Sequence, residues 1–125
     1  MARILVIDDE PHLRILLESF LLLDGHEVDL AVNGSEGMKL IERNTYDLVF
    51  TDVVMPEKDG LEVLMELKGR EPRIRIIVIS GGGERLNIKE LLNMARLLGA
   101  DRVLSKPLDF TTLLAVVKEV LEIKI

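Results

Sequence analysis

Cysteine is absent from this chain, and so is tryptophan. Without thiols the protein cannot form a disulfide, use a thiolate nucleophile or hold a cysteine-ligated zinc ion. The aromatic side chains are only Phe20, Tyr46, Phe50 and Phe110. The hydrophobic core must therefore be mainly aliphatic, which favours buried parallel strands surrounded by leucine-rich helices.

An excess of basic residues is also lacking, because 22 acidic residues outnumber 16 basic ones and give a formal net charge of −6. A negative chain is repelled by phosphate backbones, so we expect no direct binding of nucleic acid. No basic N-terminal region precedes an apolar run, as a signal peptide requires. No apolar run approaches the roughly 20 residues of a membrane span. We therefore expect a soluble, cytoplasmic protein with no membrane partner.

The length of 125 residues and the hydrophobic fraction of 48% fit one well-packed globular domain. No linker, low-complexity stretch or change of composition divides the chain. We therefore expect residues 1–125 to form a single domain.

Apolar strand-like segments alternate strictly with helix-like segments, five of each. The strands are expected at about 3–8, 26–32, 47–52, 74–80 and 101–105. Asn33, Asp59 and Asp109 stand where caps begin helices, and a further helix is expected over 85–98. This alternation predicts an α/β fold, with a parallel sheet, right-handed crossovers and helices on both faces.

Helical and strand periodicity also predicts which side chains turn inward. The expected set includes Leu13, Leu16, Leu17, Phe20, Leu21, Val28, Leu30, Val32, Leu61, Leu64, Met65, Leu67, Leu113, Leu114, Val117, Val120 and Leu121. The two histidines, His12 and His26, are expected at the surface.

Polar residues stand where four of the predicted strands end. They are Asp8 and Asp9, Asp52, Ser80 and Lys106. Parallel strands end at the same edge of a sheet, which is where open α/β sheets bind ligands. Three acids, a hydroxyl and a lysine are therefore expected to converge on one site.

Four short motifs carry a family resemblance that covers the whole chain. They are Asp8-Asp9-Glu10, Asp52-Val-Val-Met-Pro56 with Asp59-Gly60, Ser80-Gly81 and Lys106-Pro107. In this order and spacing the chain resembles a response-regulator receiver domain of bacterial two-component signalling, similar to chemotaxis regulators. The resemblance implies a flavodoxin-like, five-stranded sheet of order 2-1-3-4-5 with five helices.

The resemblance also implies a role for each matching residue. Asp52 corresponds to the phospho-acceptor, and an aspartate carboxylate is ordinarily ionised at neutral pH. Asp8 and Asp9, with Asp52, correspond to the acids that hold Mg²⁺. The metal-binding carbonyl of the family falls on Val54.

Lys106 and Ser80 correspond to the residues that contact the phosphoryl oxygens. The family also has a cis peptide bond at the position of Lys106-Pro107. One departure concerns Val103, which occupies the position where many receivers have a switching tyrosine or phenylalanine.

The function implied is signalling. A sensor histidine kinase or phosphotransfer protein would donate a phosphoryl group to Asp52, and the protein would then switch its contacts with a downstream protein. The family's output face comprises helix four, strand five and helix five, which here includes Glu90, Asn93, Met94, Leu97 and Val103.

Two alternatives stay open at this stage. The first is an enzyme, an Mg²⁺-dependent phosphatase with an aspartyl-phosphate intermediate. Such an enzyme requires an Asp-x-Asp pair, but Val54 stands two residues after Asp52 in place of the second acid. A pseudo-receiver scaffold would never be phosphorylated, and the intact acids and Lys106 argue against it. We therefore expect no enzyme beyond a module that promotes its own phosphorylation and dephosphorylation.

Overall fold

The structure is a computed structural model that describes residues 1–52, 60–67, 69–70, 73–80, 89, 93, 96–97 and 99–123, with the backbone alone at 60, 61 and 80. The strands are β1 (Arg3–Ile7), β2 (Glu27–Ala31), β3 (Leu48–Asp52), β4 (Arg75–Ser80) and β5 (Arg102–Ser105). The helices are α1 (Pro11–Leu23), α2 (Gly34–Arg43), α3 (Gly60–Leu67) and α5 (Phe110–Leu121). The helix expected over 85–98 lies mostly outside the described residues, but residues 89, 93, 96 and 97 are helical.

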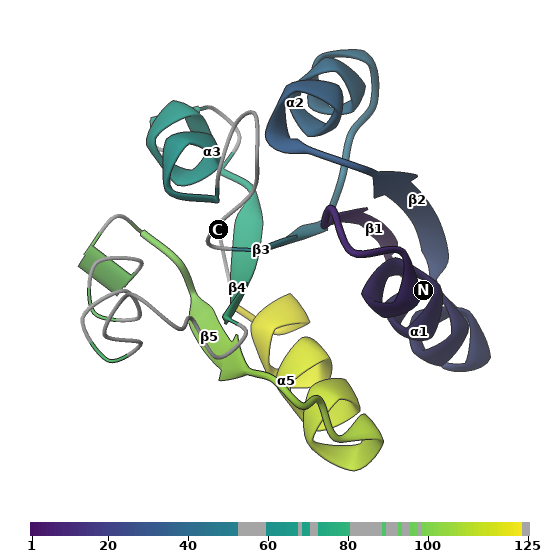
Figure 1. Ribbon diagram of the computed structural model, residues 1–125. Helices are drawn as coiled ribbons and strands as arrows, with labels where there is room; N and C mark the ends of the chain where they lie inside the picture. Colours follow the sequence, from purple (N-terminus) through teal and green to yellow (C-terminus); the bar gives the residue numbers. More distant parts are fainter. Residues whose placement is uncertain are drawn as a thin grey trace.

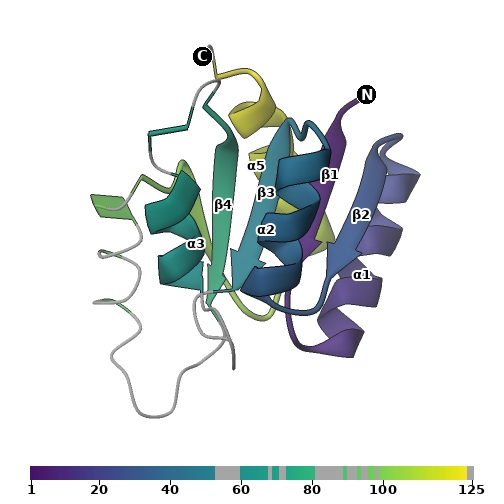
Figure 2. The ribbon, with the colours of Figure 1, turned by 90° about the horizontal axis from the view of Figure 1, so that it is seen from above.

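All five strands run parallel in one sheet, in the order β2-β1-β3-β4-β5 (Figure 2). This confirms the flavodoxin-like order. The order reverses between β1 and β3, and β3 is the central strand of the sheet. The carboxyl ends of β1 and β3 therefore lie at the switch point where open α/β sheets bind ligands.

Helices cover both faces of the sheet, with α2 and α3 on one face and α1 and α5 on the other (Figure 1). Successive residues of a strand point to opposite faces, so β1 supplies both cores. Leu5 and Ile7 pack with α2 and α3, whereas Ile4 and Val6 pack with α1 and α5. The inner strands β1, β3 and β4 are thus buried on both faces, as their continuous apolar runs predict, whereas the edge strands β2 and β5 are partly exposed.

Two helices begin with the side-chain caps that the sequence predicts. The side chain of Asn33 accepts a hydrogen bond from the backbone N–H of Glu36 at 2.8 Å. The side chain of Asp109 accepts one from the backbone N–H of Thr112 at 2.9 Å. Each cap satisfies a donor that the first helical turn leaves free.

Three of the predicted core positions are wrong, because Leu16 is 39% exposed, Val32 is 41% exposed and Met65 is 62% exposed. The buried stripe of α1 is narrower than the prediction, and Val32 lies beyond the last residue of β2. The sequence also missed Val63 and Val116, which are buried. The apolar pattern predicts which element is amphipathic better than it predicts the edges of its buried stripe.

The predicted surface position of His26 is also wrong. Its side chain is only 10% exposed, because the chain turns at Gly25, where φ is +87°, and brings residue 26 beside the start of β1. The ring atom Nδ1 accepts a hydrogen bond from the backbone N–H of Ala2 at 3.1 Å, and Nε2 lies 3.2 Å from Oδ2 of Asp24. His26 therefore ties the beginning of β2 to the beginning of β1.

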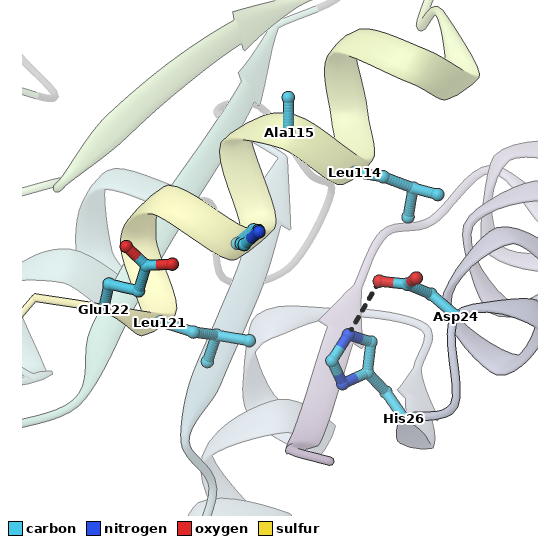
Figure 3. Close-up of a pocket in the computed structure, with 7 residues that line it drawn as sticks. Asp24, His26, Leu114, Ala115, Leu121 and Glu122 are labelled. Atoms are coloured by element: carbon cyan, nitrogen blue, oxygen red, sulfur yellow. Dashed lines mark hydrogen bonds and ion pairs between the residues drawn. The ribbon is translucent and has the colours of Figure 1, made fainter.

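A groove of about 400 Å³ lies between this turn and α5 (Figure 3). Its lining residues are Asp24, His26, Leu114, Ala115, Lys118, Leu121 and Glu122. Figure 3 shows Leu114 and Leu121 directed toward the side on which Asp24 and His26 lie. The groove is at the end of the molecule opposite to the carboxyl ends of the strands.

No helix among the described residues is both long enough and apolar enough to cross a membrane.

Candidate functional site

Three acidic side chains meet at the carboxyl edge of the sheet. Asp8 and Asp9 follow β1, and Asp52 is the last residue of β3. The two strands are hydrogen-bonded neighbours, with Ile7 in register with Thr51. One carboxylate oxygen from each acid lies within 4.8 Å of the other two. The structure thus brings the predicted acids together.

The three acids differ in their exposure to solvent. Asp8 is 1% exposed and Asp52 is 8% exposed, whereas Asp9 lies at the surface. Oδ1 of Asp8 accepts a hydrogen bond from the backbone N–H of Glu10 at 2.8 Å. Oδ2 of Asp8 is the one buried side-chain oxygen or nitrogen in the described part of the chain that has no hydrogen-bond partner. A buried oxygen without a donor is costly unless another group balances it.

Burial raises the pKa of Asp8 to about 7, because an ionised carboxylate is poorly solvated there. The hydrogen bond from Glu10 and the charge of Lys106 act in the opposite direction, and the carboxylate of Asp52 raises the pKa further. The raised pKa of Asp8 therefore shows that Lys106 and the Glu10 hydrogen bond stabilise its ionised form only in part.

Lys106 supplies the positive charge of the site. Its Nζ lies 3.0 Å from Oδ2 of Asp52, 3.5 Å from Oε2 of Glu10 and 3.9 Å from Oδ2 of Asp8. Burial lowers the pKa of Lys106, but Asp52, Asp8 and Glu10 raise it, and the net direction is upward. The peptide bond between Lys106 and Pro107 is cis, which confirms the prediction.

The acid cluster fits a hard divalent cation. Mg²⁺ prefers carboxylate and carbonyl oxygens and retains several waters, so it commonly uses one or two carboxylates. Here three carboxylates from two strands converge, and the buried Oδ2 of Asp8 has no hydrogen-bond donor. A cation beside this oxygen would balance the charge that Lys106 alone does not neutralise.

Two predicted site positions are not described in full. Ser80 ends β4 and pairs with Ser105 of β5, so its backbone is at the expected edge, but its side chain lies outside the described atoms. Val54 lies outside the described residues. Val103, at the position of the family's aromatic switch residue, is half-buried and packs against the core between the sheet, α2 and α3.

Of the predicted output face, Asn93 and Leu97 are helical and exposed. Glu90 and Met94 lie outside the described residues.

Two further residues make contacts at the site that the sequence pattern does not predict. Glu10 contacts Lys106, although the motif alone predicts only an acid near a helix start. Arg14 donates a hydrogen bond from Nη1 to the backbone carbonyl of Asp8 at 2.7 Å. The signal for Arg14 is its spacing, because a residue in the first turn of a helix after Pro11 faces back toward the preceding strand.

Comparison with known proteins gives a consistent result. Residues 4–118 match the family model of the response regulator receiver domain. The chain is 32% identical over 122 residues to sporulation initiation phosphotransferase F of Bacillus subtilis, covering 98% of this chain and 95% of that protein. It is 34% identical to the transcriptional regulatory protein CpxR homolog of Haemophilus influenzae, covering 97% of this chain but only 51% of that protein.

Solved structures agree with this result. The receiver domain of NtrX from Brucella abortus superposes with a TM-score of 0.88 at 32% identity, covering 97% of this chain and 99% of that one. A CheY-like response regulator receiver domain protein from Methanospirillum hungatei superposes with a TM-score of 0.87 at 28% identity, covering 98% and 94%. The fold, the convergent acids and these matches together show that the chain belongs to the response regulator receiver domain family of two-component signalling.

Proposed function

We propose that residues 1–125 act as one receiver unit that accepts a phosphoryl group on Asp52. The single observation that carries the proposal is the contact between Asp52 and Lys106, set beside Asp8 and Asp9. A carboxylate at a strand end, next to one cation and two further acids, is equipped to attack a phosphorus atom held there.

The transfer is a displacement at phosphorus. An oxygen of Asp52 forms a new P–O bond as the P–N bond of a phosphohistidine breaks, and the electron pair of that bond returns to the imidazole nitrogen. Lys106, already 3.0 Å from the Asp52 carboxylate, neutralises negative charge on the phosphoryl oxygens. Ser80 is the expected hydrogen-bond donor to another phosphoryl oxygen.

Asp8, Asp9 and Asp52, with the backbone carbonyl of Val54, are the residues that would hold Mg²⁺. The ion supplies positive charge that stabilises the phosphoryl oxygens and relieves repulsion among the acids. The buried Oδ2 of Asp8, which has no hydrogen-bond donor, supports this assignment.

The partners proposed are a sensor histidine kinase or phosphotransfer protein as donor, and a downstream protein as target. The target surface is the face that comprises the helix predicted over 85–98, β5 and α5. Like other receiver domains, the chain is a signalling module rather than an enzyme with a separate substrate. The cytoplasmic location predicted from the sequence stays a prediction, as does the absence of direct nucleic-acid binding.

The decisive test is phosphorylation by a small donor. The purified protein is incubated with acetyl phosphate and Mg²⁺, and its intact mass is measured. We expect the mass to rise by one phosphoryl group in the wild type and to stay unchanged in D52N. The proposal fails if the wild type gains no mass or if D52N gains as much.

Peptide mapping and a turnover assay separate the alternatives. A phosphoryl group on a residue other than Asp52 contradicts the proposed acceptor. Sustained release of phosphate from many equivalents of a phosphate ester indicates a phosphatase. Phosphorylation of Asp52 in the wild type excludes the hypothesis of a pseudo-receiver scaffold.

A further inference from the structure

The loop that carries Asp8 and Asp9 is short and has no side-chain cap. β1 ends at Ile7 and α1 begins at Pro11, so three residues connect them. Glu10 is the N-cap residue of α1, but its side chain makes no capping hydrogen bond. The ordering of this loop must therefore come from other contacts.

Besides the first backbone hydrogen bond of α1, from the N–H of Arg14 to the carbonyl of Glu10 at 3.1 Å, three hydrogen bonds hold the loop. The backbone N–H of Asp8 donates to the carbonyl of Ala31 at 3.1 Å, and Oδ1 of Asp8 accepts from the backbone N–H of Glu10 at 2.8 Å. The third runs from Nη1 of Arg14 to the carbonyl of Asp8 at 2.7 Å. Only the third comes from a side chain outside the loop.

The carbonyl of Asp8 belongs to the peptide unit that joins Asp8 to Asp9. Fixing this oxygen fixes the plane of that peptide, and therefore the direction in which the Asp9 side chain leaves the backbone. Asp9 is exposed, so little packing constrains it. The hydrogen bond also joins the first turn of α1 to the residue that follows β1, beside the acid cluster. Figure 2 shows the short connection from β1 to α1.

We propose that Arg14 is a positioning residue that holds the Asp8–Asp9 peptide in the orientation needed for divalent-cation binding. This rests on the proposed function, in which these acids bind Mg²⁺. Partners behind metal ligands commonly change metal affinity 10- to 100-fold when they are removed. A guanidinium suits the task because it stays charged and its donors are rigidly arranged.

Charge and position make opposite predictions for Arg14. As a nearby positive charge it repels a cation, so its removal strengthens cation binding if charge is its only effect. As a positioning residue it aids binding, so its removal weakens binding. The sign of the change in affinity therefore separates the two roles.

The experiment compares R14M, R14Q and R14K with the wild type by calorimetric titration with Mg²⁺. R14M removes both donor and charge, R14Q retains a donor without charge, and R14K retains the charge with a single, more flexible donor group. We expect an affinity about 10-fold weaker in R14M, a loss of a few-fold in R14K, and near wild-type affinity in R14Q.

R43M is the matched control, because Arg43 is exposed at the end of α2 and its removal changes the net charge equally. We expect R43M to bind Mg²⁺ like the wild type. Circular dichroism verifies that each variant is folded. A folded R14M that binds Mg²⁺ as tightly as the wild type, or more tightly, overturns the inference.

Amide hydrogen exchange without any cation gives an independent readout. We expect the amides of Asp9 and Glu10 to exchange faster in R14M than in the wild type, while amides of β4 are unchanged. If R14M does not fold, R14K provides the test. An R14K variant with the Mg²⁺ affinity of the wild type and the same exchange rate at the Asp9 amide overturns the inference. A wild type without Mg²⁺ affinity defeats the proposed function, and equal exchange rates in R14M and the wild type then also defeat a positioning role.

Discussion

Nζ of Lys106 lies 3.0 Å from Oδ2 of Asp52, although the two residues are 54 positions apart in the chain. The two residues stand at the ends of strands that are not neighbours, since β4 lies between β3 and β5. The lysine side chain spans this distance while remaining only 21% exposed. The site therefore has its counter-charge in position before any phosphoryl group arrives.

Replacing Lys106 with methionine should slow phosphorylation without unfolding the protein. Methionine retains an unbranched apolar side chain but removes the charge that stabilises the transferring group. Loss of such an electrostatic contact commonly lowers rates about 10²- to 10³-fold. We expect K106M to gain phosphoryl mass from acetyl phosphate at least about 10²-fold more slowly than the wild type.

The control for this prediction is K118M. Lys118 is exposed on α5 and lines the groove at the opposite end of the molecule. K118M removes the same charge but should be phosphorylated at the wild-type rate. Equal rates in K106M and K118M contradict a role for Lys106 in the transfer.

Replacing Asp8 with asparagine should stabilise the cation-free protein at pH 8. The change removes a buried charge whose Oδ2 has no hydrogen-bond partner, a defect that typically costs about 1–3 kcal/mol. Urea denaturation in the presence of a chelator measures the free energy of unfolding. Added Mg²⁺ should stabilise the wild type and reduce or reverse the advantage of D8N.

The pH dependence of this advantage follows from the pKa of Asp8, which folding raises from 3.8 to about 7. The native state binds the proton more tightly than the unfolded state, so this group favours folding at low pH and loses that contribution as the pH rises through about 7. The difference between D8N and the wild type should shrink as the pH falls from 8 toward 4. An advantage that is constant over this range contradicts the assignment.

The sequence predicted the architecture well because its signals are local and repeated. Apolar runs such as Ile4 to Ile7 predict buried strands, and side chains such as Asn33 and Asp109 predict helix starts. Alternation then restricts the topology. The burial of single positions was less predictable. Leu16 is exposed and Val116 is buried, against the prediction, because packing between elements decides both and the periodicity of one element does not reveal it.

The site was predictable as a set of residues but not as a set of contacts. Strand ends identified Asp8, Asp9, Asp52 and Lys106, because parallel strands share one edge. The hydrogen bond of Arg14 to a backbone carbonyl depends on how α1 leaves β1. The contact of Glu10 with Lys106 depends on the same geometry. This geometry also leaves Oδ2 of Asp8 buried without a hydrogen-bond donor. Such contacts follow from the path of the chain in space.

The contact between Gly37 and Ile7 predicts that G37A destabilises the fold. A Cβ on Gly37 would lie 2.4 Å from Cδ1 and 2.8 Å from Cγ1 of Ile7, which is 1% exposed. Overpacking of this kind costs about 1–3 kcal/mol, partly offset by the roughly 1 kcal/mol advantage of alanine in a helix. We expect a net loss of up to about 2 kcal/mol in urea denaturation.

A double-mutant cycle tests whether Ile7 is the cause. I7V removes the Cδ1 methyl group and alone should cost about 0.5–1.5 kcal/mol. The double variant should be less destabilised than the sum of the two single changes, because the new methyl group gains space. Strict additivity would show that the loss in G37A arises elsewhere.

The charged cap of α5 should make its contribution to stability depend on pH. Oδ2 of Asp109 accepts hydrogen bonds from the backbone N–H and the hydroxyl of Thr112, both at 2.9 Å, and these bonds lower the pKa of Asp109 below its usual 3.8. A lowered pKa means that the group stabilises the fold above about 3.8 and loses this contribution as the pH falls through the native value. D109A should therefore be less stable than the wild type at pH 7, and the gap should narrow below about pH 4.

N33A is the control, because Asn33 caps α2 without a charge, so its cost of about 0.5–2 kcal/mol should not vary with pH. Urea denaturation of both variants between pH 3 and 7 measures the two gaps, and a gap for D109A that stays constant over this range rules out the charged cap as its source.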